Sequence, residues 1–131
     1  MLKKILVVDD SPAIHQIYQI TLARYKCPVL SALNGQEGLN QLALNPDINL
    51  LIVDMHMQPH MSGLEFISRV KEQEAFNNIP IIAVLLRAKD EEDSQKVLHL
   101  AEGILKKPFT SREIHLEIER FFPESVLQPI T

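Results

Sequence analysis

The sequence has little cysteine, little glycine and no tryptophan: one cysteine and four glycines occur in 131 residues. With Cys27 alone, no intramolecular disulfide can form, which fits a reducing compartment. No apolar run approaches the roughly 20 residues that span a membrane. The run Ile5–Val8 follows two lysines but ends in two acids, and it is too short for the core of a signal peptide. We therefore expect a soluble, cytoplasmic protein that does not associate with membranes.

Basic residues are also scarce. Thirteen lysines and arginines stand against 17 acids, which gives a formal net charge of -4 and a pI near 5.7. Because duplex binding depends on neutralising phosphates with basic side chains, direct nucleic-acid binding is not expected. A length of 131 residues, with 46% hydrophobic and 23% charged residues, indicates one ordinary globular domain.

Short apolar runs alternate along the chain with segments of helical period. The expected strands are Ile5–Val8, Val29–Leu33, Ile48–Val53, Ile79–Leu86 and Gly103–Leu105. The helices between them are expected to start at Ser11-Pro12, Asn34–Glu37, Ser62–Glu65, Asp90–Asp93 and Thr110–Glu113. Three of these starts have the pattern of a capping box. Five β–α units of this kind predict a parallel sheet with helices on both faces.

The apolar spacing predicts which side chains the helices bury. In the first helix the candidates are Ile14, Ile17, Tyr18, Thr21, Leu22 and Tyr25. In the later helices they are Leu39, Leu42, Ala43, Phe66, Ile67, Val70, Val97, Leu98, Ala101, Ile114, Ile118 and Phe121. Three histidines, His15, His99 and His115, fall in helices and are expected at the surface.

Four charged residues follow the expected strands. Asp9 and Asp10 come directly after the first strand, Asp54 after the third, and Lys107 just past the fifth. In open parallel sheets, ligands bind outside the carboxyl ends of the strands, where these ends meet at one edge. The topology therefore predicts that the four side chains converge, although each acid taken alone is more typical of a solvated strand end.

Three carboxylates close together repel one another unless a cation lies between them. A cluster of hard oxygen ligands suits Mg²⁺ or Mn²⁺, which use one or two protein carboxylates directly and keep several waters. A carboxylate can also attack phosphorus to form an aspartyl phosphate, while a lysine contacts another phosphoryl oxygen. The set thus points to a phospho-acceptor site.

The motifs that carry this chemistry also resemble a known family. Asp9-Asp10-Ser11-Pro12 after a strand, Asp54 after an apolar strand, and Lys107-Pro108-Phe109 before the last helix are similar to the receiver domain of response regulators, including chemotaxis regulators. The resemblance covers residues 1–122, and 123–131 would be a tail or the start of a linker. It implies a flavodoxin-like α/β fold: a doubly wound (βα)5 domain whose five parallel strands lie in the order 2-1-3-4-5.

The resemblance implies a role for each site residue. Asp54 would accept a phosphoryl group, and Asp10 and Asp54 would bind Mg²⁺ (or Mn²⁺) directly. Asp9 would act on the metal through water, the His56 backbone carbonyl would complete the protein ligands, and Lys107 would contact the phosphoryl group. The protein would be a signalling protein of a two-component system rather than an enzyme.

The resemblance also implies partners. The phosphoryl donor would be a histidine kinase or a phosphotransfer protein. The output would pass to a downstream effector protein or a fused domain. The last two β–α units could form a homodimer face.

The sequence departs from the receiver pattern at three places. Pro59 and Gly63 come one position late, which predicts one inserted residue after His56. Leu85 stands where the family has a serine or threonine that hydrogen-bonds the phosphoryl group, and leucine has no donor. Ile104 stands at the aromatic switch position. The switch region is therefore atypical.

A guanidinium could supply the missing donor. Arg87 lies two residues beyond Leu85, and the alternative is a solvated arginine that faces Asp90 or Glu91.

Two other functions are compatible with parts of this pattern. The substitutions at Leu85 and Ile104 favour a degenerate receiver that acts as a phosphorylation-independent interaction module. A haloacid-dehalogenase-type phosphatase also forms an aspartyl phosphate, but it requires Asp-x-Asp after its nucleophile strand. Neither Asp9-Asp10-Ser11 nor Asp54-Met55-His56 supplies that motif.

Overall fold

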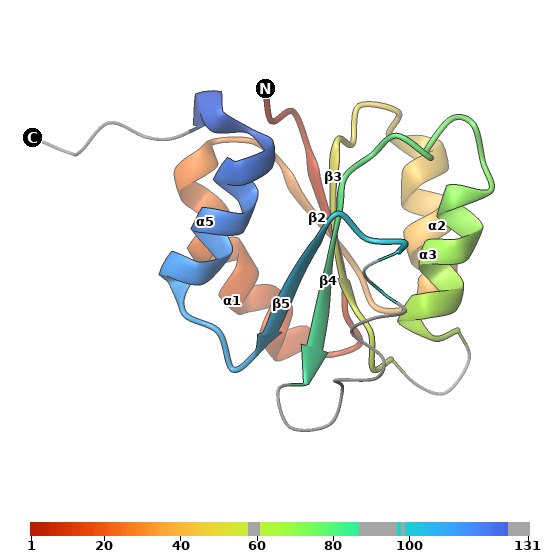
Figure 1. Ribbon diagram of the computed structural model, residues 1–131, viewed down its shortest axis with the longest axis horizontal. Coiled ribbons are helices and arrows are strands. Elements are labelled where there is room, and N and C mark those ends of the chain that lie inside the picture. The colour runs from red at the N-terminus through yellow and green to blue at the C-terminus, as the bar shows by residue number, and fades with distance from the viewer. Residues whose placement is uncertain (58–60, 87–96, 98, 126–131) are drawn as a thin grey trace, which may run out of the picture.

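The computed structural model describes residues 1–57, 61–86, 97 and 99–125. Its centre is a five-stranded parallel sheet in the order β2-β1-β3-β4-β5, which confirms the predicted topology (Figure 1). The strands are β1 (Ile5–Val8), β2 (Val29–Ala32), β3 (Leu50–Asp54), β4 (Ile81–Leu86) and β5 (Gly103–Lys107). Lys107 is therefore the last residue of β5 rather than a residue just past it.

Four helices are described around the sheet. They are α1 (Pro12–Leu22), α2 (Gly35–Leu44), α3 (Gly63–Lys71) and α5 (Ser111–Phe121), with 3-10 turns at Ala23–Tyr25 and Pro123–Ser125. The helix expected from Asp90 onward falls largely on 87–96 and 98, outside the described residues, as does Leu98 of its predicted apolar face. In the part of the chain that is described, no helix is long and apolar enough to cross a membrane.

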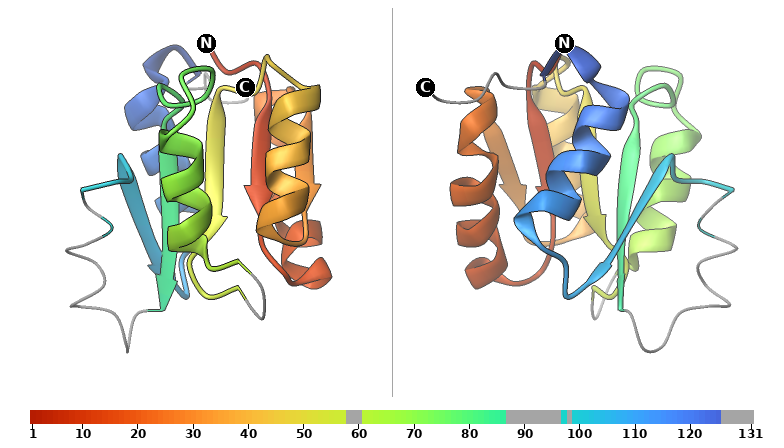
Figure 2. Two further views of the ribbon diagram at one scale, coloured as in Figure 1. Left: turned by 90° about the vertical axis from the view of Figure 1, so that its right-hand side faces the viewer. Right: turned by 60° about the vertical axis from the view of Figure 1, so that its left-hand side comes forward.

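The sheet separates two apolar layers. Helices α1 and α5 cover one face, and α2 and α3 cover the other (Figures 1 and 2). Side chains alternate between the layers along a strand: Ile5 and Val7 pack with α1 and α5, while Leu6 and Val8 pack with α2 and α3. Both layers need apolar contacts, so the inner strands are apolar at every position except Asp54, the last residue of β3, as expected of a buried parallel sheet.

Polar side chains begin each described helix. Ser11, Asn34, Ser62 and Thr110 each accept a hydrogen bond from a backbone N–H three residues later. Only Thr110 and Glu113 form the complete reciprocal capping box. The other two predicted boxes are half formed, because the Glu37 carboxylate accepts from the Leu33 N–H and that of Glu65 pairs with Arg69.

Helix α1 buries a stripe that overlaps the predicted one, since Tyr18 and Leu22 are buried as predicted. Its buried residues are His15, Tyr18 and Leu22, while Ile17 is 55% exposed. The prediction that His15 lies at the surface is therefore wrong, whereas His99 is exposed and His115 half-buried.

The cause of the shifted stripe is the direction in which the helix faces the sheet. His15, Tyr18 and Leu22 are three and four residues apart and so lie on the helix face that packs on the sheet. Ile17 lies off this face and is exposed.

Gly63, the first residue of α3, packs directly on the strand that ends in Asp54. A Cβ at this position would collide with the Asp54 carbonyl oxygen and would lie 2.6 Å from the Met55 Cα. Both obstacles are backbone atoms, so neither can rotate away. Gly63 thus lets the start of α3 approach the end of β3 closely.

Replacing this glycine should therefore destabilise the fold. We expect Gly63→Ala to lower the free energy of unfolding by roughly 1–3 kcal/mol, the usual scale of overpacking, as measured by urea denaturation. Gly103→Ala is the matched control, because its Cβ would meet only side-chain atoms, the end of Glu117 and the Phe121 ring at 3.1 Å, and no backbone atom. An equal loss in both variants would contradict this account.

Candidate functional site

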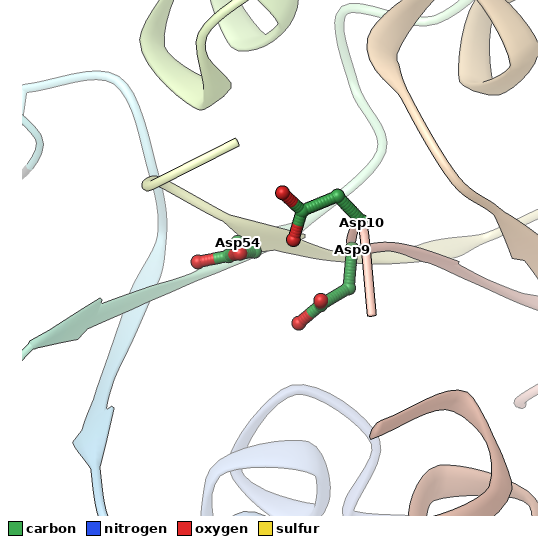
Figure 3. Close-up of side chains that lie close together, drawn as sticks. All are labelled: Asp9, Asp10 and Asp54. Carbon is green, nitrogen blue, oxygen red and sulfur yellow. The ribbon is translucent and has the colours of Figure 1, made fainter. Parts of the chain in front are cut away.

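Three carboxylates meet at the carboxyl ends of β1 and β3. Asp9 and Asp10 follow β1, Asp54 ends β3, and one oxygen of each lies within 4.8 Å of the others (Figure 3). Asp9 and Asp54 are 2% and 4% exposed, whereas Asp10 is exposed. In Figure 3 the Asp9 carboxylate points toward the layer of α1 and α5. The Asp10 side chain points the opposite way, toward the layer of α2 and α3. The predicted convergence of these acids is therefore present.

Backbone hydrogen bonds hold Asp9 in place. Its N–H donates to the Ala32 carbonyl of β2 at 3.0 Å, which extends the sheet by one residue. Its Oδ1 accepts from the Ser11 N–H at 2.9 Å, and Ser11 in turn caps α1. The second oxygen, Oδ2, is buried and has no hydrogen-bond partner in the described part of the chain. A buried carboxylate oxygen without a donor needs a cation or another donor nearby.

Asp54 is held in a similar way. Its Oδ1 accepts a hydrogen bond from the His56 N–H at 3.1 Å, and the next residue, Met55, pairs with Val84 of β4. Burial raises the pKa of the Asp54 carboxyl, and the charges of Asp9 and Asp10 raise it further. The His56 hydrogen bond and Lys107 lower the pKa but do not cancel these effects. The folded protein thus holds an acid whose charge is unfavourable without a cation.

Lys107 brings a positive charge to the same place. Its Nζ lies 3.6 Å from Asp9 Oδ2 and 3.7 Å from Asp54 Oδ1. Both separations exceed hydrogen-bond length, so the ammonium group stands between two carboxylates without a close contact to either. One lysine against three acids leaves the cluster with an excess of negative charge.

The residues present fit a magnesium or manganese ion. All donors are hard carboxylate oxygens, one is exposed to solvent for water ligands, and buried Asp9 Oδ2 lacks a hydrogen-bond donor. The His56 backbone carbonyl stays a predicted ligand. Its N–H turns toward Asp54, which places this loop beside the cluster.

The two atypical switch positions lie in the apolar core. Leu85 is 1% exposed and packs in the layer of α2 and α3, where Ile104 packs against the same cluster. These two aliphatic side chains thus occupy the positions at which the family has a hydroxyl group and an aromatic ring. Arg87, the candidate compensating donor, lies outside the described residues, as do 58–60 beside the predicted insertion.

Two residues on α1, His15 and Tyr18, were not predicted as residues of the site. His15 Nε2 donates to the Asp9 carbonyl oxygen at 2.7 Å and lies 3.1 Å from the Ala32 carbonyl oxygen. The ring thus links the residue that follows β1 to the last residue of β2. Tyr18, one turn later, is buried on the same face of α1. Tyr18 was predicted only as a packing residue and His15 as a surface residue, because spacing along a helix does not distinguish packing from a role at the site.

Comparison with known proteins identifies relatives along most of the chain. The sequence profile of the response regulator receiver domain matches residues 5–119. A chemotaxis protein CheY homolog of Campylobacter jejuni is 33% identical over 117 residues, covering 88% of this chain and 89% of that protein.

Other relatives carry the receiver as one part of a longer chain. The Bacillus subtilis alkaline phosphatase synthesis transcriptional regulatory protein PhoP is 36% identical over 129 residues, covering 95% of this chain and 50% of that protein. Among solved structures, the Vibrio cholerae chemotaxis response regulator CheY4 has a TM-score of 0.80 at 30% identity, covering 92% and 98% of the two chains.

The raised pKa of Asp54 has a consequence for stability. In the folded state this carboxyl binds its proton more tightly than in the unfolded state, so stability falls as the pH rises through the raised pKa. Asp54→Asn should therefore raise the free energy of unfolding at pH 7 without divalent cations, by about 1–2 kcal/mol for charges at this separation.

Urea denaturation at pH 7 with and without Mg²⁺ checks this expectation. Mg²⁺ should stabilise the wild type but have little effect on Asp54→Asn. Asp47→Asn is the control, and it should lower the free energy of unfolding rather than raise it, because the hydrogen bond from Lys4 lowers the pKa of exposed Asp47. A wild type that gains no stability from Mg²⁺ would speak against a metal at these acids.

Proposed function

The chain belongs to the response regulator receiver family, and from that premise we propose that it accepts a phosphoryl group on Asp54 from a histidine kinase or phosphotransfer protein. The observation that carries the proposal is the convergence of Asp9, Asp10 and Asp54 beside Lys107 at one edge of the sheet. The site is open on the Asp10 side, so a donor can approach from solvent.

The transfer replaces one bond to phosphorus by another. A carboxylate oxygen of Asp54 attacks the phosphorus of a phosphohistidine, the P–N bond breaks, and the imidazole leaves with its electron pair and takes up a proton. The Lys107 ammonium group contacts a phosphoryl oxygen and offsets its charge. The ionised Asp54 suits the nucleophile, and the backbone N–H of His56 orients its Oδ1.

A divalent cation belongs to this proposal. Asp10, Asp54 and the His56 backbone carbonyl would hold Mg²⁺ (or Mn²⁺) directly, and Asp9 would act through a water ligand. When bound, the ion supplies positive charge that offsets the three carboxylates and the incoming phosphoryl group. Asp9 stays in position for this role through Ser11 and Ala32.

The output passes through protein–protein contacts, to an effector protein or a fused domain. We propose residues 1–122 as the receiver unit, acting in the cytoplasm, with a homodimer through the last two β–α units as a further arrangement. The relatives differ in this respect: one is a chemotaxis protein and another a transcriptional regulatory protein.

A second candidate function rests on Leu85 and Ile104. Because both pack in an apolar layer and neither offers a polar group, the usual hydroxyl-and-aromatic movement has no counterpart at these positions. A degenerate receiver that binds its partner without phosphorylation would keep this packing in all states.

Incubation with acetyl phosphate and Mg²⁺ tests the first function. We expect the intact mass of the wild type to rise by one phosphoryl group, and that of Asp54→Ala to stay unchanged, because the acceptor oxygen is lost. Equal phosphorylation of both proteins would assign the acceptor elsewhere, and no phosphorylation of either would favour the interaction module.

A further inference from the structure

Tyr18 carries a hydroxyl that is buried without a partner. The residue is 2% exposed in the middle of α1, and its hydroxyl oxygen makes no hydrogen bond to any residue of the described chain. A buried tyrosine usually satisfies its hydroxyl while its ring packs, because an unpaired polar group destabilises the fold. This hydroxyl is therefore a donor that the resting structure leaves unused.

Tyr18 lies on the side of the sheet toward which the Asp9 carboxylate points (Figure 3). It packs in the layer of α1 and α5. Its ring lies 6.2 Å from that of Phe109, and with Lys107 both line a hollow of about 450 Å³. Burial, followed by the charges of Asp9 and Asp54, raises the pKa of Tyr18, so the hydroxyl keeps its proton and can donate.

The matching acceptor is also present. Asp9 Oδ2 is buried and has no hydrogen-bond partner among the described residues. In the resting state the nearby Lys107 ammonium group, at 3.6 Å, offsets its charge. The same ammonium group is 3.7 Å from Asp54 Oδ1, so it is shared between the two acids.

A phosphoryl group on Asp54 would disturb this balance. It adds negative charge on the Asp54 side of the shared ammonium group and draws Lys107 toward itself. Asp9 Oδ2 would then stay buried and charged without the nearby ammonium group, and no described side chain or backbone group donates to it, which is unfavourable. The hydroxyl of Tyr18 can fill that deficit.

We propose that Tyr18 is a positioning residue, whose hydroxyl donates a hydrogen bond to Asp9 Oδ2 when Lys107 moves to a phosphoryl group on Asp54. This rests on the proposed function and adds to it a phosphorylation-dependent contact on the face of α1 and α5. The contact lies across the sheet from Leu85 and Ile104, in a layer that these aliphatic residues do not occupy. The Tyr18 hydroxyl moves toward Asp9 and changes the packing of its ring against Phe109.

The test uses beryllofluoride with Mg²⁺, which stands in for a phosphoryl group on a carboxylate. Tyr18→Phe removes only the hydroxyl and should weaken beryllofluoride binding about tenfold, the effect of one hydrogen bond to a charged group. Binding of Mg²⁺ alone should not change, because Lys107 still offsets Asp9. The matched control is Tyr25→Phe, which also removes one tyrosine hydroxyl. In the wild type that hydroxyl hydrogen-bonds His115 Nδ1 at 2.9 Å.

A spectroscopic measurement makes the test independent of the Tyr18 variant. The chain has two tyrosines, so Tyr25→Phe labelled with 13C at tyrosine Cζ gives a single tyrosine resonance, that of Tyr18. Beryllofluoride with Mg²⁺ should shift this resonance, as a new hydrogen bond to a carboxylate requires, and Mg²⁺ alone should shift it less.

Three outcomes would overturn the proposal, and they are distinguishable. Equal beryllofluoride affinity in wild type and Tyr18→Phe, or an unmoved Tyr18 resonance when beryllofluoride binds, rejects the hydrogen bond and leaves phosphorylation of Asp54 intact. An equal loss of Mg²⁺ and beryllofluoride affinity in Tyr18→Phe indicates a structural role only. A wild type that neither binds beryllofluoride nor gains a phosphoryl group on Asp54 rejects the proposed function together with this inference.

Discussion

The mutual repulsion of three carboxylates is the constraint on which the site depends. A parallel sheet brings the ends of β1 and β3 side by side, and this chain places Asp9, Asp10 and Asp54 there. The repulsion is tolerated because apolar side chains pack both faces of the sheet and because backbone N–H groups hold one oxygen each of Asp9 and Asp54. Lys107 offsets part of the charge, and the remainder is negative charge that a bound cation would offset.

The two faces of the sheet contribute differently to that response. On the face of α2 and α3, Leu85 and Ile104 complete an apolar layer. On the face of α1 and α5, Tyr18 and Lys107 border one hollow, and the Lys107 ammonium group lies close to Asp9 and Asp54. In the proposed function, accepting phosphate would depend on the acids and Lys107, while sensing it would depend on which face can rearrange. Among the described residues, the buried side-chain atoms without a hydrogen-bond partner are Asp9 Oδ2, His15 Nδ1 and the Tyr18 hydroxyl oxygen, and they lie on the second face.

The fold and the acidic site could be predicted from the sequence because both follow from periodicity and topology. Apolar runs ending in Asp9 and Asp54 identify buried strands and place their ends at one edge. The details that depend on packing could not be predicted. His15 is buried because α1 turns that face to the sheet, and its ring is held by two carbonyls that are distant in sequence. The role of Gly63 likewise depends on how closely α3 approaches β3, which no local pattern encodes.

The central claim is that the three acids form one cation site beside the phospho-acceptor. A crystal structure grown with Mn²⁺ and beryllofluoride, with the ion located by its anomalous signal, tests this most directly. We predict one Mn²⁺ bound by Asp10, Asp54 and the His56 carbonyl, with beryllium on an Asp54 oxygen and Lys107 Nζ on a fluoride. An ion bound elsewhere, or acids that carry no ion while beryllofluoride is present, would contradict the account.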